Sequence, residues 1–315
     1  MVRRVRRLVA LVALVALALP ARAAGVDPSA DGPYAVGVTT VTFMDASRSR
    51  TLVTEVWYPA RSAGRDASAR RGRYPLVLVA HGYCGFRTNY EYLSVPLASW
   101  GFLVAAPDFP GINRADCDAG VPPGDIIGDP PRDLAFLRGA FHDRSGPARA
   151  LARLVRGKRA GLVGHSLGGA AVVHASLADP DLTAVVALAA VAGSAQGQAF
   201  HGLRPRRAVL VAGGTADTTV LFDRDPAPLF AALPAPAFLV KIVGGTHSGF
   251  TDMDSRLSAE QLARQQALTR RYATAFLERY LARDRRFARF LAPADAAAEG
   301  TDVELTARSR RAGSR

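Results

Sequence analysis

Gly164-His165-Ser166-Leu167-Gly168 is a G-x-S-x-G motif, and the residues on either side of it decide the fold. The preceding stretch, Arg159–Val163, has the length and character of a short buried strand, and Leu167–Val173 predicts the start of a helix. A sharp turn from strand to helix holds a serine with its Oγ projecting from the edge of a sheet. The glycines are needed because the two backbones nearly touch there. The motif therefore predicts that Ser166 is a nucleophile.

Apolar runs separated by helical segments surround this motif. They are Pro75–Ala80, Phe102–Ala106, Ala160–Val163, Ala184–Ala189, Ala208–Val211 and Phe238–Val243. Such runs indicate a parallel sheet buried on both faces. Nearer the N-terminus, Tyr34–Phe43 and Thr51–Tyr58 alternate in the β manner around a turn at Asp45–Arg50, which predicts an antiparallel hairpin. The predicted fold class is α/β, with a mostly parallel twisted sheet, helices on both faces and an N-terminal antiparallel hairpin.

The chain of 315 residues shows no internal repeat and no second domain, so we expect a single domain over residues 24–291. Arg61–Arg73 is polar and arginine-rich, which predicts a loop. The last helix is expected to begin at Ser258, because Gln261 can complete a capping box. One buried stripe of that helix repeats every four residues. It consists of Leu268, Tyr272, Phe276 and Tyr280. Residues 292–315 are rich in alanine, aspartate and arginine, which predicts a disordered tail.

Residues 1–23 predict a signal peptide. Four arginines between positions 3 and 7 precede the apolar run Leu8–Leu19, which is too short to span a bilayer comfortably. Pro20–Ala23 then offers a small-x-small cleavage site. No cysteine follows the apolar run, which disfavours a lipid-anchored lipoprotein. We therefore expect a secreted or periplasmic protein, and an uncleaved N-terminal anchor is the alternative.

The formal net charge of +13 does not by itself indicate nucleic-acid binding. Of the 40 basic residues only Lys158 and Lys241 are lysine, which with abundant alanine, glycine and proline indicates a bias of composition. Residues 1–23 hold five arginines and no acidic residue, so their removal lowers the charge to +8. The remaining basic residues are spread along the chain rather than gathered in a stripe. We expect a monomer with no nucleic-acid partner, while peripheral contact with a membrane or another anionic surface stays open.

A serine nucleophile needs a base to take its proton and an acid to hold that base. In a parallel sheet of this kind the partners follow in the order Ser, Asp, His, on loops after later strands. Val209–Asp217 is an apolar run followed by small residues and an aspartate, and Phe238–His247 repeats that design with a histidine. Both loops follow the carboxyl ends of strands, where open α/β sheets place their ligands. The sequence therefore predicts Ser166 as nucleophile, His247 as base and Asp217 as acid.

Other residues compete for these roles. Asp223 and Asp225 follow the same run as Asp217, but they lie in a polar stretch well past its end. His165 sits inside the motif itself, where we expect its side chain to pack beside the nucleophile and contact the substrate rather than act as base. A turn or cap aspartate is the structural alternative for Asp217.

The oxyanion of the tetrahedral intermediate needs two N–H donors. One is expected from the backbone of Leu167, at the start of a helix whose dipole assists. The other is expected from the backbone of Tyr83, in the loop His81–Gly85, and the Tyr83 ring would overhang the acyl site. The alternative is that Gly82 and Gly85 only make a tight turn.

The chain has two cysteines, Cys84 and Cys117. Export permits a disulfide, and both residues are expected in loops at the same edge of the sheet. A disulfide and two unpaired thiols both stay open. Residues 111–130, rich in glycine, proline and aspartate, are expected to form a modest lip over the site.

These motifs resemble the α/β-hydrolase superfamily over roughly Tyr34 to Leu291. More narrowly, the chain resembles the exported serine-esterase branch, which includes platelet-activating-factor-acetylhydrolase-like, chlorophyllase-like and cutinase-like polyester hydrolases. Gly32–Gly37 and Glu55–Pro59 are similar to the opening hairpin of that group. Dienelactone hydrolases share the architecture but use a cysteine nucleophile. Cutinase-like members usually carry a tryptophan where this chain has Ala187–Gly193, and its absence counts against polyester cleavage.

The function predicted from these residues is cleavage of carboxylic esters, small or lipid, through an acyl-enzyme. A lipase, a phospholipase A2-type acetylhydrolase, a polyester hydrolase, a thioesterase and an amidase could use the same three residues. The serine at the elbow disfavours dehalogenases and epoxide hydrolases, which use aspartate. A non-catalytic binding member of the fold is the alternative from a different class. We expect no cofactor and no metal, because the sequence has neither zinc-type spacing nor the lysine of a P-loop.

Overall fold

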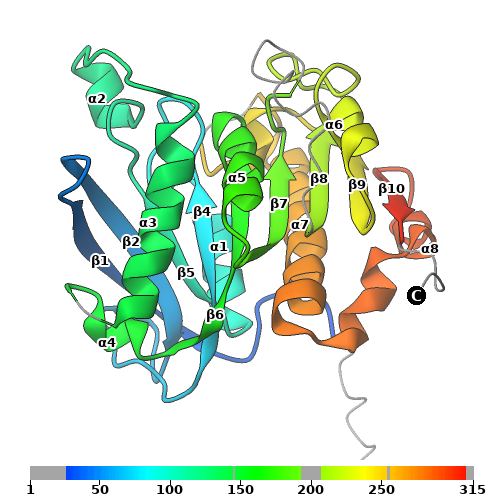
Figure 1. Cartoon of the computed structure of the whole chain (residues 1–315). Helices are drawn as coiled ribbons and strands as arrows, with labels where there is room; N and C mark the ends of the chain where they lie inside the picture. Colours follow the sequence, from blue (N-terminus) through cyan, green and yellow to red (C-terminus); the bar gives the residue numbers. More distant parts are fainter. Residues whose placement is uncertain (1–25, 145, 193–206, 254–255, 310–315) are drawn as a thin grey trace, which may run out of the picture.

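One twisted sheet runs through the computed structural model, which describes residues 26–144, 146–192, 207–253 and 256–309 (Figure 1). The strands are β1 (Ala35–Asp45), β2 (Arg50–Ala60), β3 (Gly64–Arg65), β4 (Tyr74–Ala80), β5 (Leu103–Pro107), β6 (Val155–His165), β7 (Leu182–Leu188), β8 (Ala208–Gly214), β9 (Ala237–Ile242) and β10 (Val303–Arg308). Their order in the sheet is β10-β9-β8-β7-β6-β4-β5-β2-β1-β3.

The helices connect these strands. They are α1 (Glu91–Ser99), α2 (Arg114–Asp118), α3 (Asp129–Asp143), α4 (Arg149–Ala152), α5 (Leu167–Ala178), α6 (Pro226–Ala232), α7 (Ala259–Leu277) and α8 (Pro293–Ala298). Two 3-10 helices, η2 (Ser248–Phe250) and η4 (Arg285–Leu291), and a π-helix, η3 (Glu278–Ala282), complete the secondary structure of the described residues.

The parallel part of the sheet comprises β4 to β9, and each apolar run singled out in the sequence overlaps one of its strands to within one or two residues at most of its ends. Alternate residues of β4 enter different layers of the core: Leu76 and Leu78 pack on one side, Val77 and Val79 on the other. All seven residues of β4 are buried. The strands lack polar alternation because both faces of the sheet are covered.

Helices cover both faces. Figure 1 shows α3, α5 and α6 in front of the sheet and α1 and α7 behind it, and the two core clusters divide in the same way. The predicted hairpin is formed by β1 and β2, which pair antiparallel from Ala35 with Ala60 to Asp45 with Arg50. The predicted fold class is therefore confirmed. Arg61–Arg73 is a loop except for β3, which pairs with β1.

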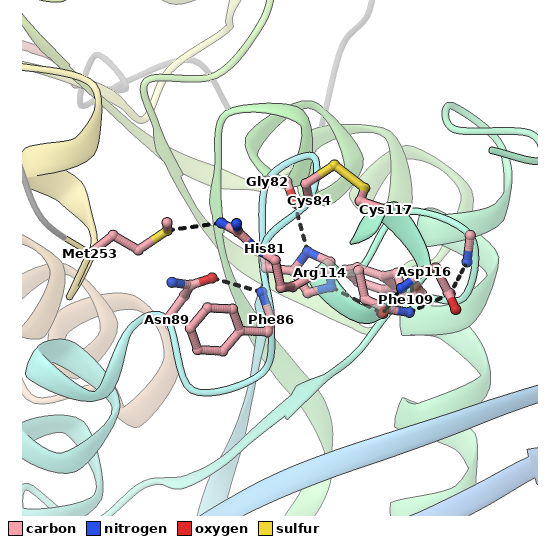
Figure 2. Close-up of a disulfide and its surroundings, with 12 residues drawn as sticks. His81, Gly82, Cys84, Phe86, Asn89, Phe109, Arg114, Asp116, Cys117 and Met253 are labelled. Carbon is pink, nitrogen blue, oxygen red and sulfur yellow. Dashed lines mark hydrogen bonds between the residues drawn. A yellow bond between two sulfur atoms is a disulfide. The ribbon is translucent and has the colours of Figure 1, made fainter. Parts of the chain in front are cut away.

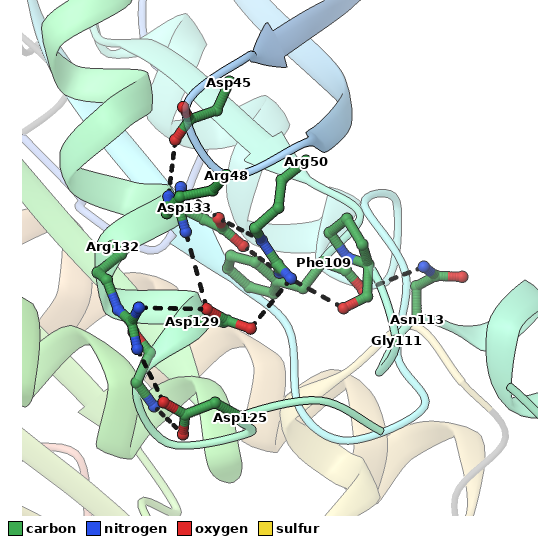
Figure 3. A network of polar contacts seen from close by, with 12 residues as sticks. Asp45, Arg48, Arg50, Phe109, Gly111, Asn113, Asp125, Asp129, Arg132 and Asp133 are labelled. Carbon is green, nitrogen blue, oxygen red and sulfur yellow. Dashed lines mark hydrogen bonds and ion pairs between the residues drawn. The ribbon is translucent and has the colours of Figure 1, made fainter. Parts of the chain in front are cut away.

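The turn of this hairpin is fastened to α3 by an ion-pair network (Figure 3). Arg50 donates through Nε and a terminal nitrogen to the two carboxylate oxygens of Asp133, at 2.8 and 2.6 Å. A terminal nitrogen of Arg48 lies 2.7 Å from an oxygen of the same carboxylate. A terminal nitrogen of Arg50 lies 3.1 Å from a carboxylate oxygen of Asp129. The Asp133 side chain is fully buried. Because a buried carboxylate is costly without partners, this network holds the hairpin in one orientation on the sheet.

The last long helix begins as the sequence predicts. Ser258 is the N-cap of α7, its side chain accepts from the backbone N–H of Gln261, and the Gln261 side chain accepts from the backbone N–H of Ser258. The predicted stripe faces the sheet, with its first three members fully buried and the last half-buried.

The prediction of a disordered tail over residues 292–315 is wrong for the part that the structure describes. Residues 293–298 form α8, and β10 pairs antiparallel with β9, so that Val303 lies opposite Ile242 and Leu305 opposite Val240. Val303 and Leu305 are buried. The short V-E-L-T-A-R alternation gains stability only by pairing with the otherwise open edge of β9, which composition alone does not show. The domain therefore extends beyond Leu291.

The predicted signal peptide, residues 1–23, lies outside the described residues. Within the described ranges, no helix has the length and apolar character needed to cross a membrane.

Candidate active site

Ser166 occupies the turn between β6 and α5 with a strained backbone. Its φ of 57° and ψ of −121° are unusual for a residue with a Cβ. A Cβ on Gly164 would collide with the carbonyl of Gly168, and one on Gly168 would collide with the carbonyl of Ala80. The Ser166 N–H donates to the carbonyl of Leu188 at 2.9 Å. The flanking glycines and this bond hold the elbow that the motif predicts.

Asp217 follows β8, and its side chain is fully buried. One carboxylate oxygen accepts from the backbone N–H groups of Thr219 and Val220, both at 2.8 Å. The other lies 2.8 Å from Nδ1 of His247. Three contacts of this kind fix the orientation of the carboxylate.

The competing aspartates lie elsewhere. Asp225 is buried, pairs with Arg224 at 2.8 Å and accepts from the backbone N–H of Ala192 at 2.9 Å. Asp223 is exposed. Of the three aspartates that the sequence offers, Asp217 is therefore the one whose carboxylate contacts His247.

The loop that carries His247 is held by a residue that sequence reasoning missed. Gln265, buried on α7, accepts from the backbone N–H of Thr246 at 3.0 Å and donates to the carbonyl of Thr246 at 2.9 Å. This two-bond clamp fixes the residue before the candidate base. The sequence does carry a signal for this role of Gln265. The residue lies three positions before Leu268 on the buried face of the helix, where a polar side chain needs a hydrogen-bond partner.

His165 packs beside the candidate base. Its ring centroid lies 4.5 Å from that of His247, and its Nδ1 lies 3.1 Å from the hydroxyl of Tyr90. Burial, and then the charge of His247, lowers the pKa of His165 well below its usual value. A neutral His165 ring adds no positive charge next to His247. Tyr90, another residue that sequence reasoning missed, is held by its own bond from the backbone N–H of Gly82.

His81 shapes the loop after β4. Its Nε2 accepts from the backbone N–H of Phe109 at 3.0 Å, so the proton resides on Nδ1 and is donated to the carbonyl of Gly82 at 2.7 Å. Burial lowers the pKa of His81 to about 4, so the ring is neutral near pH 7. The ring therefore ties this loop to Phe109, two residues after the end of β5.

Most backbone N–H groups of the loop His81–Gly85 have a hydrogen-bond acceptor. Gly82 donates to the Tyr90 hydroxyl, Cys84 to the carbonyl of Ile112 and Gly85 to the carbonyl of Gly82. Among the described residues no acceptor is in place for the Tyr83 N–H. Tyr83 lines the same cavity as Ser166, the residue that directly precedes Leu167 and α5.

Cys84 and Cys117 form a disulfide that joins this loop to α2 (Figure 2). Their Cα atoms are 5.8 Å apart. Residues 113 and 85 also form a β-bridge, and Asn113 caps α2 by accepting from the backbone N–H of Asp116. The segment that the sequence marked as a lip is thus attached to the loop that carries Tyr83.

These elements enclose a cavity of about 200 Å3. It is lined by Gly82, Tyr83, Cys84, Gly85, Asn89, Tyr90, Arg114, His165, Ser166, His247, Ser248, Thr251 and Met253. A larger cavity of about 550 Å3 lies against the outer strands, but its lining holds neither Ser166 nor a histidine. In the described ranges no group of histidine, cysteine, aspartate and glutamate side chains is arranged to hold a metal ion. The arrangement can hold a small ester beside a serine, a histidine and backbone donors.

Comparison with known proteins places the chain in a family. A family model described as PET hydrolase-like matches residues 20–309. The chain is 23% identical over 270 residues to a bis(hydroxyethyl) terephthalate hydrolase of Streptomyces coelicolor. The aligned region covers 83% of this chain and 72% of that protein. It is 23% identical over 237 residues to cutinase est2 of Thermobifida alba. That aligned region covers 73% of this chain and 68% of that protein. The resemblance inferred from the motifs is confirmed.

Proposed function

Because the chain belongs to the PET hydrolase-like family of α/β-hydrolases, we propose that it is an exported serine hydrolase that cleaves carboxylic esters through an acyl-enzyme. One observation carries this proposal: Asp217 holds Nδ1 of His247 at 2.8 Å, while His247 and Ser166 line the same cavity. Signal-directed export rests on residues 1–23 of the sequence.

The proposed mechanism begins with Ser166. Its Oγ attacks the ester carbon while His247 removes the hydroxyl proton through Nε2. Asp217 keeps the proton of the neutral ring on Nδ1 and stabilises the imidazolium that forms. The tetrahedral oxyanion accepts from the backbone N–H groups of Tyr83 and Leu167, each worth roughly 3 kcal/mol to the transition state.

Collapse of the intermediate breaks the bond to the alcohol oxygen, which takes the proton from His247. Water then attacks the acyl carbon, His247 again acts as base, and release of the acid restores Ser166. The proposed steps use Ser166, His247, Asp217, the two backbone donors and one water molecule.

A polyester is a second candidate substrate. The absence of tryptophan in residues 187–193 counted against it, whereas the family description and the two relatives support it. An open cavity bordered by the exposed ring of Tyr83 is accessible to a chain end. A polyester film assayed beside soluble nitrophenyl esters distinguishes the two substrates.

The test of the proposed function is Ser166→Ala. We expect 4-nitrophenyl ester hydrolysis to be lost and labelling by a fluorophosphonate to disappear, while the circular dichroism spectrum is unchanged. Ser176→Ala is the control, since Ser176 lies on the same helix, α5, and donates only to the carbonyl of Val173. Retained turnover in Ser166→Ala would rule out the assigned nucleophile.

A further inference from the structure

Arg114 lies at the candidate active site without an acidic partner in the described part of the chain. It lines the cavity together with Ser166 and His247. Its side chain is exposed, and its guanidinium reaches toward Met253, whose sulfur lies 3.9 Å from a terminal nitrogen (Figure 2). Other arginines near the site are paired: Arg87, for example, lies 2.6 Å from a carboxylate oxygen of Asp108. The donors of Arg114 are therefore available to a ligand.

In the described part of the chain, the lining of this cavity includes no carboxylate and no lysine, and Arg114 is its one arginine. The N-terminus of α5, where Leu167 follows Ser166, adds a partial positive charge. Both features favour a negatively charged group on the substrate.

The position of Arg114 is fixed through its backbone. Its N–H donates to the carbonyl of Gly85 at 2.8 Å, and the preceding Ile112 carbonyl accepts from the N–H of Cys84. The disulfide from Cys117 closes the same segment onto the loop. The segment that carries Arg114 is therefore attached to the loop that carries the proposed oxyanion donor, and Arg114 and Tyr83 line the same cavity.

From these contacts we propose that Arg114 binds a free carboxylate at the far end of the acyl group. The substrate class is then the half-ester of a dicarboxylic acid, and this inference rests on the proposed function. The guanidinium of an arginine presents two parallel N–H donors that match the two oxygens of a carboxylate. The ammonium group of a lysine lacks this paired geometry. Hydrolysis breaks the acyl carbon–oxygen bond and releases a dicarboxylate and an alcohol. Such half-esters arise when a diester or polyester is cleaved once, so the enzyme consumes the product of a first ester hydrolysis.

The test compares two substrates of equal length that differ in one terminal group. They are mono-4-nitrophenyl adipate, which ends in a carboxylate, and 4-nitrophenyl hexanoate, which ends in a methyl group. Arg114→Gln removes the charge, and Arg114→Lys retains it without the paired donors. Arg61→Gln is the control, because Arg61 is an exposed arginine that follows β2 at the opposite edge of the sheet.

In Arg114→Gln we expect KM for the adipate half-ester to rise about tenfold, as for loss of a hydrogen bond to a charged group. KM for the hexanoate ester should change less than twofold, and kcat for both esters should be nearly unchanged. Arg114→Lys should recover part of the preference. Raising the salt from about 0.05 M to about 0.5 M should weaken adipate binding by the native enzyme and leave the glutamine variant unaffected.

Equal effects of Arg114→Gln on both esters, or no effect on either, would overturn the assignment of Arg114. In that case, Ser166-dependent hydrolysis of the hexanoate ester would still support the proposed function. If neither ester is hydrolysed by the native enzyme, the proposed function fails and the inference fails with it.

Discussion

The Asp217 carboxylate lies 2.8 Å from Nδ1 of His247, although the residues are 30 positions apart in the chain. They meet because β8 and β9 are parallel neighbours, with Gly214 opposite Ile242 at their carboxyl ends. The loops that follow almost touch, since a Cβ on Gly214 would collide with the backbone of Gly245. Adjacent strands of equal direction therefore bring the two side chains together.

Asp217→Asn should lower kcat by roughly four orders of magnitude, because an amide favours the wrong tautomer of His247. The measurement is kcat for a 4-nitrophenyl ester near pH 8. Asp223→Asn is the matched control, as an exposed aspartate of the same loop. If kcat falls sharply in the Asp223 variant while the Asp217 variant stays active, the assignment of Asp217 as the acid is wrong.

His81→Phe should reduce kcat roughly tenfold or more, with a smaller effect on KM, because the loop that presents the Tyr83 N–H loses both bonds of the imidazole. The free energy of unfolding should fall by about 2 kcal/mol, since the Phe109 N–H is left buried without its acceptor. Kinetics and urea denaturation measure these effects. An unchanged kcat in a destabilised variant would show that His81 supports the fold and not the donor.

Gly168→Ala should destabilise the protein by about 2 kcal/mol or more, because the added methyl group meets the backbone carbonyls of Ala80 and His81. Gly139→Ala is the matched control. Gly139 lies within α3 with no atom in the way of a Cβ, and alanine there should stabilise the helix by about 1 kcal/mol. Thermal unfolding of both variants provides the comparison, and effects of equal sign would contradict this account of the elbow.

Reduction of the disulfide should lower the free energy of unfolding by about 3 kcal/mol, because Cys84 and Cys117 close a loop with a sequence separation of 33. Activity should fall as well, since the bond holds α2 against the loop that carries Tyr83. Thermal unfolding with and without reductant measures the first effect. A variant with serine at both cysteine positions is the control and should not respond to reductant.

Glu278 gives the stability a dependence on pH. Burial, and then the charge of Asp284, raises its pKa to about 7, although Arg156 and Arg286 oppose the shift. Between about pH 4.5 and 7 the folded protein thus binds more protons than the unfolded chain. The contribution of Glu278 is fully present below about pH 4.5 and is lost as the pH rises through about 7.

Glu278→Gln should therefore be more stable than the native protein at pH 8, by about 2 kcal/mol, and nearly equal to it at pH 5. Urea denaturation at the two pH values measures the difference. If the advantage of the variant is the same at both pH values, the glutamate is not the titrating group.

The sequence by itself determined the elements whose signals are local. Each apolar run predicted a buried strand, the glycines around Ser166 predicted an elbow, and Ser258 with Gln261 predicted where α7 begins. These signals are local because burial and backbone geometry act on consecutive residues. The parallel topology then placed the loops ending in Asp217 and His247 at one edge of the sheet.

Tertiary structure alone decided which distant residues meet. It brought Asp217 rather than Asp225 to His247, joined the two cysteines and paired β10 with the edge of β9. It also placed Gln265 against the loop of the candidate base and Arg114 over the cavity. These contacts depend on which strands are neighbours and on their register, because a side chain gains a partner only where another segment ends within hydrogen-bonding distance. The order of residues within one segment does not reveal how far its side chains lie from those of another segment.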